Sequence, residues 1–265
     1  PHFPDFQFFF EDLPELNLLE YEQLEQYFTS TFVNIVINCA AYTAVDQAED
    51  EFKIARQLNA VAIESLCQLS KTFDFKLIHF STDYVFDGTA SEPYKENDSL
   101  KPIGVYGQTK AEGETVMRNA GIDGWIIRTS WLFSPHGKNF VKTIFSLLQN
   151  KAEINVVADQ TGSPTYALDL AAITLKGLSQ NPKFNGVKIY HITNSGHTTW
   201  YGIANAIQKQ INTHCKIHPV DTVNYPSKAQ RPKYSVLSCE KIRKEFNINL
   251  EPWESALKDC LKKIK

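Results

Sequence analysis

Apolar and polar residues follow two different periods along this chain. Short, largely apolar runs at 33–38, 75–80 and 124–128 are typical of buried parallel strands. Stretches with a helical period lie between these runs, at 21–28, 46–70 and 106–119. Strands and helices alternate in this way up to about residue 145, which predicts an α/β fold with a doubly wound parallel sheet.

The second half of the chain has a different pattern. Helical periods occur at 139–149, 167–178, 199–210, 238–246 and 253–263, with a short strand at 154–157 and another sheet strand at 186–192. This predicts a smaller α+β lobe beside the sheet. We expect one domain at 1–150 plus about 186–194 and a second at 151–185 and 195–265, with ligand in the cleft between them.

The first residues suggest a strand, Phe6–Phe10, that ends in Glu11-Asp12. An acidic strand end of this kind binds the adenosine ribose in dinucleotide folds, but a glycine-rich turn normally precedes it. The first glycine here is Gly88. We therefore expect the sequence to start about one β-α unit late, with residues 1–12 beside an open gap in the sheet and no ordered dinucleotide. The missing unit is either truncated or disordered, and the cost of unpaired strand neighbours favours disorder.

Composition excludes several classes of protein. The 265 residues carry a net charge of −3, which gives no reason to expect nucleic acid or an anionic membrane as a partner. No apolar run approaches the ~20 residues of a membrane span. Five scattered cysteines without a C-x-x-C pair predict reduced thiols in a cytoplasmic protein, and neither a disulfide framework nor a metal site.

Candidate chemistry appears at the end of the 75–80 strand. Ser81-Thr82 follows this strand, and open α/β sheets place their ligands at such carboxyl ends. Tyr106 and Lys110 are spaced i, i+4 on a predicted helix, so both face one side. An ammonium group beside a phenol favours the phenolate and lowers its pKa, and Thr82 can hydrogen-bond the same reacting oxygen. A Tyr–Lys pair alone is most often a surface feature, but the strand-end Ser-Thr favours a proton-transfer site.

The same residues carry a resemblance to a known family. Tyr106-x-x-x-Lys110 with the upstream Ser-Thr resembles the extended, sugar-nucleotide branch of the short-chain dehydrogenase/reductases, which have a Rossmann-like fold. Five longer strings are similar to the dTDP-4-dehydrorhamnose reductase family, in its order and spacing, from about residue 12 to the C-terminus. They are Asn38-Cys-Ala-Ala-Tyr-Thr-Ala-Val-Asp46, Ser81-Thr-Asp-Tyr-Val-Phe86, Val105-Tyr-Gly-Gln-Thr-Lys110, Arg128-Thr-Ser-Trp131 and Asp159-Gln-Thr-Gly-Ser-Pro-Thr165.

The resemblance implies an activity and a partner. The reaction would be reduction of the C4 ketone of dTDP-4-dehydro-L-rhamnose to dTDP-L-rhamnose by NADPH or NADH, and Mg²⁺ takes part in some family members. Tyr106 would donate the proton, Lys110 would bind the nicotinamide ribose, and Thr82 would hold the substrate oxygen. The oligomeric state would be a monomer or a homodimer.

The binding residues follow from the resemblance and from local pattern. By resemblance, the cofactor would contact Ala41, Tyr42 and Thr43, with Asn59 bracing Lys110, and the sugar would contact Asp83 and Trp131. Asp12 at its strand end could reach an adenosine ribose. Arg231 is a candidate for a diphosphate contact, because a guanidinium forks onto two oxygens.

Three alternatives share this scaffold. A sugar-nucleotide 4,6-dehydratase would need Asp-Glu directly after the threonine, whereas Asp83-Tyr84 follows Thr82 here. A 4-epimerase would show a Ser-Ser-Ala/Thr string, which is absent. A non-catalytic NADP-binding regulatory subunit, similar to the β subunit of methionine adenosyltransferase, is disfavoured by the intact Thr82, Tyr106 and Lys110. Turnover of the keto-sugar separates this last alternative from an enzyme.

Overall fold

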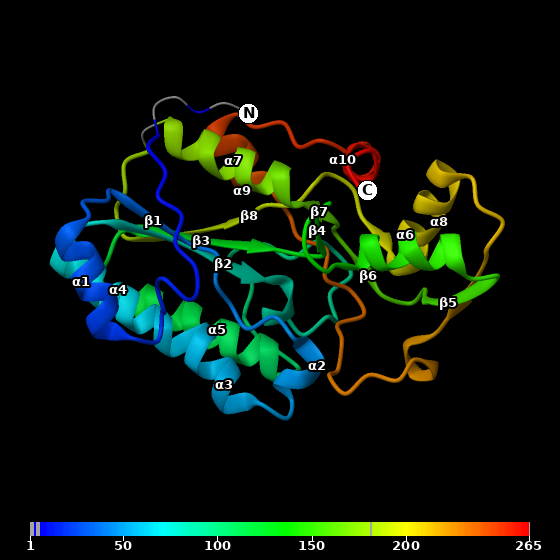
Figure 1. Cartoon of the computed structure of the whole chain (residues 1–265), viewed down its shortest axis with the longest axis horizontal. Coiled ribbons are helices and arrows are strands. Elements are labelled where there is room, and N and C mark those ends of the chain that lie inside the picture. The colour runs from blue at the N-terminus through cyan, green and yellow to red at the C-terminus, as the bar shows by residue number, and fades with distance from the viewer. Residues whose placement is uncertain (1–2, 4–5, 181, 265) are drawn as a thin grey trace.

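The centre of the molecule is a parallel sheet of four strands, β1-β2-β3-β8 in spatial order (Figure 1). The computed structural model describes residue 3, residues 6–180 and residues 182–264. The strands are β1 Ile35–Asn38, β2 Lys76–Thr82, β3 Gly124–Thr129 and β8 Val187–His191. Ile78 of β2 lies opposite Ile37 on one side and Trp125 on the other, so apolar side chains pack across the sheet. The predicted α/β fold with a parallel sheet is confirmed.

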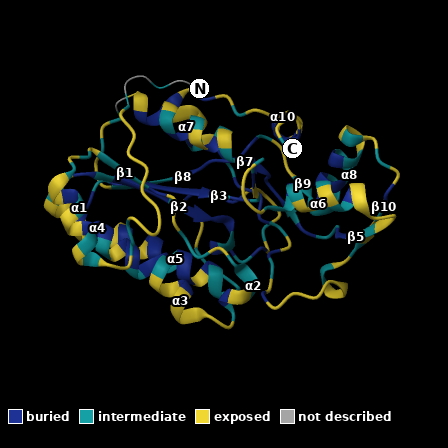
Figure 2. Ribbon diagram, in the orientation of Figure 1, coloured by how far each residue is buried: buried dark blue, intermediate teal, exposed yellow. Residues whose placement is uncertain are grey.

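Helices cover both faces of this sheet (Figure 1). One face carries α3 Phe52–Arg56, the π-helical turn η1 Gln57–Val61, α4 Ala62–Phe73 and α5 Val105–Asn119, with α1 Tyr21–Ser30 packed on α4. The other face carries α7 Ala167–Ser179 and α9 Glu240–Phe246. Burial of both strand faces explains why the strands are apolar without alternation (Figure 2). Leu77 and Ile126 pack in the cluster toward α4, and Trp125 and Ile127 in the cluster toward α7 and α9.

A second group of elements packs around its own apolar cluster. It comprises α6 Phe140–Asn150, α8 Trp200–Ile211, α10 Trp253–Leu261 and a parallel pair of strands, β5 Glu153–Val157 and β10 Lys216–Val220. Ile144, Ile207 and Leu257 meet in this cluster. The predicted boundary at residue 150 assigns α6 to the first domain, yet α6 packs here against α8. The division into domains stays a prediction.

Short elements connect these two groups. They are α2 Val45–Ala48, the 3-10 turns η2 Asp83–Val85 and η3 Thr222–Asn224, the ladder of β4 Leu132–Phe133 with β7 Thr165–Tyr166, and the ladder of β6 Thr161–Gly162 with β9 Thr198–Thr199. Within the described residues, no helix is both long enough and apolar enough to cross a membrane.

Two predicted elements differ from the structure. Phe6–Phe10 forms no strand. Among the described residues, β1 is an edge strand of the sheet and no strand lies alongside residues 6–10. Phe10 is accordingly 88% exposed. The helix predicted at 46–70 is interrupted after α2 at residues 49–51, where two carboxylates bond to groups outside the helix. Glu49 accepts a bond from the Val105 amide, and Glu51 accepts one from the Tyr42 hydroxyl.

Candidate active site

The predicted reaction centre lies where β2 ends and α5 begins. Thr82 is the last residue of β2, and its Oγ1 accepts a hydrogen bond from the Tyr84 amide at 3.2 Å, which starts the turn η2. A Cβ on Gly107 would lie 2.1 Å from the Tyr84 carbonyl oxygen, so only glycine lets α5 lie this close to that turn. As a result, the Tyr106 ring lies 5.6 Å from the Tyr84 ring and within hydrogen-bonding reach of Thr82.

The surroundings of Tyr106 keep its phenol protonated. Burial raises the pKa of Tyr106 to about 12, a hydrogen bond with Thr82 acts in the opposite direction, and the Asp83 carboxylate raises it further. This differs from the expectation that Lys110 lowers this pKa. The reason is that the Lys110 amine is turned toward β2, where it donates to the Phe80 carbonyl at 2.6 Å. A protonated phenol is the form that a proton donor needs.

Lys110 is buried, with 1% of its surface exposed. Burial lowers its pKa to about 8, and the Glu114 carboxylate one turn along α5 opposes this shift. The Lys110 Nζ also lies 3.2 Å from Nε2 of His79, a fully buried residue of β2. Burial, and then the neighbouring Lys110, lower the pKa of His79 well below its usual value, so this imidazole is neutral. Sequence reasoning missed His79, although a histidine inside an apolar strand was a visible signal.

Asn59 joins the loop after β1 to α5. Its Oδ1 accepts from the Tyr42 amide at 2.9 Å, and its Nδ2 donates to the Tyr42 carbonyl at 3.1 Å and to Thr109 Oγ1 at 3.0 Å. Asn59 lies in the π-helical turn η1, a distortion that often marks functional sites. The predicted cofactor loop 41–43 is thereby held beside the helix that carries Lys110.

Asp12 is not brought into this group. It is exposed, its Oδ1 accepts from the Leu13 amide at 2.9 Å, and its carbonyl accepts from the Leu16 amide. Its predicted ribose contact stays a prediction.

Asp83 presents an unused acceptor beside the reaction centre. It is buried, its Oδ1 accepts from Thr82 Oγ1 at 3.1 Å, and its Oδ2 has no hydrogen-bond partner among the described residues. Burial raises the pKa of Asp83 to about 6, and the nearby hydroxyls of Ser235 and Thr82 oppose this shift. A buried acceptor without a partner is costly, so a ligand hydroxyl at this position would fit.

Trp131 lies in a stack of aromatic rings after β3. Its ring is stacked on Trp200 at 3.6 Å with an angle of 8° between the planes, and its φ of 48° is in the left-handed region. A Cβ on Gly162 would lie 2.4 Å from the Trp131 ring, so the 159–165 motif lies directly against it. Gln160 of this motif accepts from the Trp200 indole at 3.0 Å. Trp200 was missed from the sequence, where it reads only as the start of a helix.

Arg231 already has an anionic partner. Its guanidinium donates to the two carboxylate oxygens of Asp46 at 2.8 and 3.2 Å, and it lies close to the Tyr84 hydroxyl. An anionic ligand at Arg231 would therefore compete with Asp46, and the predicted diphosphate contact stays a prediction.

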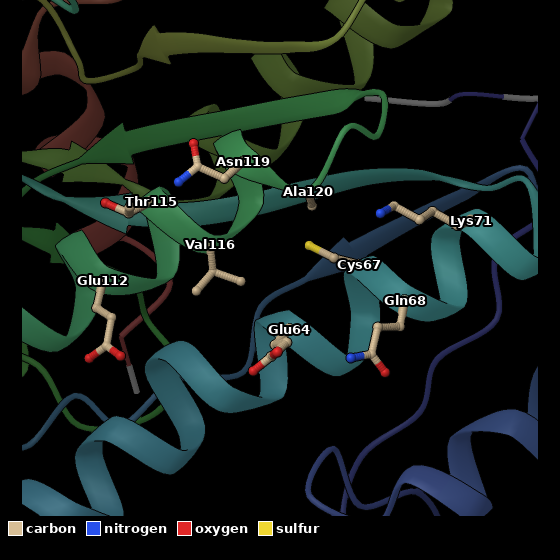
Figure 3. Close-up of a pocket in the computed structure, with 9 residues that line it drawn as sticks. All are labelled: Glu64, Cys67, Gln68, Lys71, Glu112, Thr115, Val116, Asn119 and Ala120. Atoms are coloured by element: carbon tan, nitrogen blue, oxygen red, sulfur yellow. The ribbon is translucent and has the colours of Figure 1, made fainter.

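A separate groove lies on the outer side of α4 and α5 (Figure 3). Its lining includes Cys67 and Gln68 of α4 and Thr115 and Asn119 of α5, but not the reaction centre. Among the residues that the structure describes, no three His, Cys, Asp or Glu side chains gather in a way that could hold a metal ion.

Comparisons with known proteins agree with this geometry. The model of the family described as "RmlD substrate binding domain" matches residues 5–265. A dTDP-4-dehydrorhamnose reductase of Aggregatibacter actinomycetemcomitans is 38% identical over 94% of this chain and 87% of its own length. A probable dTDP-4,6-dihydroxy-2-methyloxan-3-one 4-ketoreductase of Streptomyces antibioticus is 38% identical over 87% of this chain and 78% of its own length.

Solved structures give the same result. The crystal structure of a dTDP-4-dehydrorhamnose reductase from Bacillus anthracis, in complex with NADP, superposes with a TM-score of 0.90 at 35% identity, covering 95% of this chain and 88% of that one. Sequence and structure therefore agree that this chain belongs to the RmlD family.

Proposed function

We propose that this chain reduces the C4 ketone of dTDP-4-dehydro-L-rhamnose with NADPH or NADH and forms dTDP-L-rhamnose. The assignment of the chain as a sugar-nucleotide reductase of the RmlD family rests on its relatives and on the superposed structure. The choice of dTDP-4-dehydro-L-rhamnose as the substrate is part of the proposal, because one relative of equal identity carries the name of a different 4-ketoreductase. The observation that carries the proposal is the protonated Tyr106 phenol beside Thr82 at the carboxyl end of β2.

The residues present fit the nicotinamide end of a cofactor. The 41–43 loop is fixed by Asn59, and Lys110 lies one turn along α5 from Tyr106, so both border the same end of the sheet. When bound, the nicotinamide supplies the hydride for the ketone carbon. The described residues before Gly88 contain no glycine-rich turn for the pyrophosphate, so we assign no residue to that part.

The protein residues then handle the proton and the position of the ketone. Tyr106 gives its phenolic proton to the substrate oxygen as negative charge develops there. Thr82 orients the same oxygen, and the free Oδ2 of Asp83 accepts from a sugar hydroxyl. Lys110 would hold the nicotinamide ribose when the cofactor is bound.

The test is an assay of the protein with dTDP-4-dehydrorhamnose and each reduced nicotinamide. Loss of nicotinamide absorbance with formation of dTDP-rhamnose, identified by mass spectrometry, is the expected result. The Tyr106→Phe variant is the control for enzyme-dependent turnover. If this keto-sugar is not consumed while the S. antibioticus type of 4-keto-sugar is, the substrate assignment is wrong but the reductase assignment holds. Consumption of neither keto-sugar would favour the regulatory-subunit alternative.

A further inference from the structure

A buried ion pair that takes no part in the proposed chemistry joins α5 to the sheet. Glu114 of α5 and Arg128 of β3 are 0% and 1% exposed. Arg128 donates through Nε to Glu114 Oε1 at 2.9 Å and through Nη2 to Oε2 at 2.7 Å. The hydroxyl of Ser81, in β2, donates to the same Oε1 at 2.6 Å. Donors from two neighbouring strands therefore hold one carboxylate of α5 from two directions.

The Arg128 guanidinium is itself fixed. Its Nη1 donates to the Glu96 carbonyl at 3.2 Å and lies 3.3 Å from His191 Nε2. Burial, and then the charge of Arg128, lower the pKa of His191 to about 3, so this imidazole is neutral and can accept from Nη1. The guanidinium also lies over the Phe86 ring, 5.2 Å from its centroid. Arg128 therefore cannot follow Glu114 if α5 shifts.

Such an ion pair contributes direction more than stability. Removing two charges from water offsets most of their attraction, and an apolar pair of similar volume often stabilises a fold equally well. Apolar side chains can slide along their neighbours, whereas a hydrogen bond weakens steeply when its distance or angle changes. A carboxylate bound by donors from two strands therefore has one favourable position, and it fixes the helix that carries it.

The position that it fixes is that of α5 relative to the end of β2. Three residues on one face of α5 contact the segment 80–84, and they are spaced i, i+3 and i+7: Gly107, Lys110 and Glu114. This segment includes Thr82, the expected partner of the substrate oxygen. The way in which α5 runs past residues 80–84 therefore determines where the Tyr106 phenol lies relative to Thr82.

We propose that Ser81 is a positioning residue, which acts through Glu114 to hold α5 so that the Tyr106 phenol meets the substrate oxygen at Thr82. This inference rests on the proposed function, in which Tyr106 gives the proton. Ser81 needs no contact with substrate or cofactor for this role. Removal of its hydroxyl releases Glu114 from β2 but leaves the pair with Arg128 in place, so no charge near the reaction centre is lost.

Ser70 provides a matched control for the loss of one buried hydroxyl. Ser70 and Ser81 are both 4% exposed, and each donates one hydrogen bond of 2.6 Å, to the Phe75 carbonyl and to Glu114 respectively. Ser70 lies in α4, outside the reaction centre. Ser70→Ala and Ser81→Ala should each lower the melting temperature by about 2–8 °C.

The first test compares the kinetics of these two variants well below their melting temperatures. Ser81→Ala should lower kcat by about 10–100-fold, because a displacement of ~1 Å at a reacting group can have an effect of this size. Its KM for the reduced nicotinamide should stay within about twofold of the native value, since the 41–43 loop is untouched. Ser70→Ala should keep kcat within about twofold. Equal kcat values of the two variants would mean that Ser81 is only structural, and would overturn the proposal.

The second test does not depend on turnover. In protein labelled with ¹³C at tyrosine Cζ, the Tyr106 signal is the one that Tyr106→Phe removes. Its chemical shift reports the surroundings of the phenol, so Ser81→Ala should move or split this signal and Ser70→Ala should leave it unchanged. An unchanged signal in Ser81→Ala would overturn the proposal, whatever the enzyme assay shows. If the native protein consumes no keto-sugar, the proposed function fails, and this signal alone decides whether Ser81 positions Tyr106.

Discussion

Two phenols of this protein, the buried Tyr94 and the half-buried Tyr106, have different surroundings. Tyr94 donates to the Asp87 carboxylate at 2.7 Å and accepts from two loop amides, so its hydroxyl anchors the loop. The Tyr106 hydroxyl lies within reach of Thr82 at the open end of the sheet. The first arrangement fixes a loop, whereas the second leaves a proton available to a ligand.

Replacing Tyr106 by Phe should therefore lower kcat by ~10²–10⁴, the usual contribution of a general acid. The ring stays in place, so the melting temperature should change little. Steady-state kinetics and thermal unfolding measure the two effects. Tyr94→Phe is the matched control, and its kcat should stay within about threefold of the native value, because it lies outside the reaction centre. Turnover by Tyr106→Phe above about half of the native rate would show that another group is the acid.

Asp83 makes stability depend on pH in an unusual direction. Its pKa is about 6 in the folded protein, against an ordinary value of 3.8, because burial disfavours the carboxylate. Between these values the folded protein binds a proton that the unfolded chain releases, so stability falls as pH rises through this window. Asp83→Asn removes the charge. The unfolding free energy of this variant minus that of the native protein should therefore increase by ~2–3 kcal/mol from about pH 4 to about pH 7.

Urea unfolding at several pH values measures this difference. Asp87→Asn provides a control of opposite sign, because the Tyr94 hydrogen bond lowers the pKa of Asp87. Its carboxylate stabilises the fold fully above the ordinary value of 3.8, so the stability deficit of this variant relative to the native protein should grow as pH rises toward about 3.8 and then stay constant from about pH 4 to about pH 7. Parallel behaviour of the two variants would contradict the role of burial at Asp83.

Among the elements, those with a clear hydrophobic period were predictable. The strand expected at 75–80 is β2, and the helix expected from Tyr106 to about Asn119 is α5. Thr82, Tyr106 and Lys110 could be placed together because local pattern fixed the ends of both elements. The approach of α5 to η2 could not be derived, because it depends on the contact of Gly107 with a turn about twenty residues earlier in sequence.

What the sequence did not reveal arises from contacts between distant elements. His79 is a strand residue by pattern, and its side chain contacts Asn38 and Lys110 of two other elements. Trp200 likewise gains its place from stacking on Trp131. The helix predicted at 46–70 is interrupted where Glu49 and Glu51 bond to groups outside it, and helix propensity does not predict such contacts between distant residues.

Asn59 offers a test at the scale of elements. It satisfies the amide and carbonyl of Tyr42 and the hydroxyl of Thr109, all from within the π-helical turn η1. Asn59→Ala should lower the unfolding free energy by about 2–4 kcal/mol, because buried polar groups lose their partners. It should also weaken nicotinamide binding, since the 41–43 loop is released.

Urea unfolding and cofactor titration measure these two effects. Asn150→Ala is the control, because Asn150 is exposed and bonds only within the end of α6, so its effect should stay below about 0.5 kcal/mol. Equal effects of the two substitutions would show that Asn59 does not hold the loop.

At the scale of the whole molecule, residues 227–231 contact α2 and the turn that follows it. Asp46 accepts from the Ser227 hydroxyl at 3.0 Å, from the Ala229 amide at 3.1 Å and from the Arg231 guanidinium at 2.8 Å. Lys228 pairs with Asp50. These contacts join segments 178 to 185 residues apart in sequence and secure a stretch, 221–230, that is mostly exposed.

Asp46→Asn should loosen this stretch while changing global stability by less than about 1 kcal/mol, because Asp46 is half exposed and solvent screens its charge. Limited proteolysis followed by mass spectrometry should show faster cleavage within 221–230.

Salt should speed this cleavage in the native protein and have less effect in the variant, which lacks the ion pair. Burial disfavours the Asp46 carboxylate, but the hydrogen bonds from Arg231, Ala229 and Ser227 and the charge of Arg231 together outweigh burial and lower the pKa of Asp46, so the contact should persist until pH falls below that depressed value. As a control, Asp259→Asn removes an exposed ion pair at the end of α10 and should leave cleavage at 221–230 unchanged. Equal cleavage of the native protein and of Asp46→Asn would mean that other contacts hold this stretch.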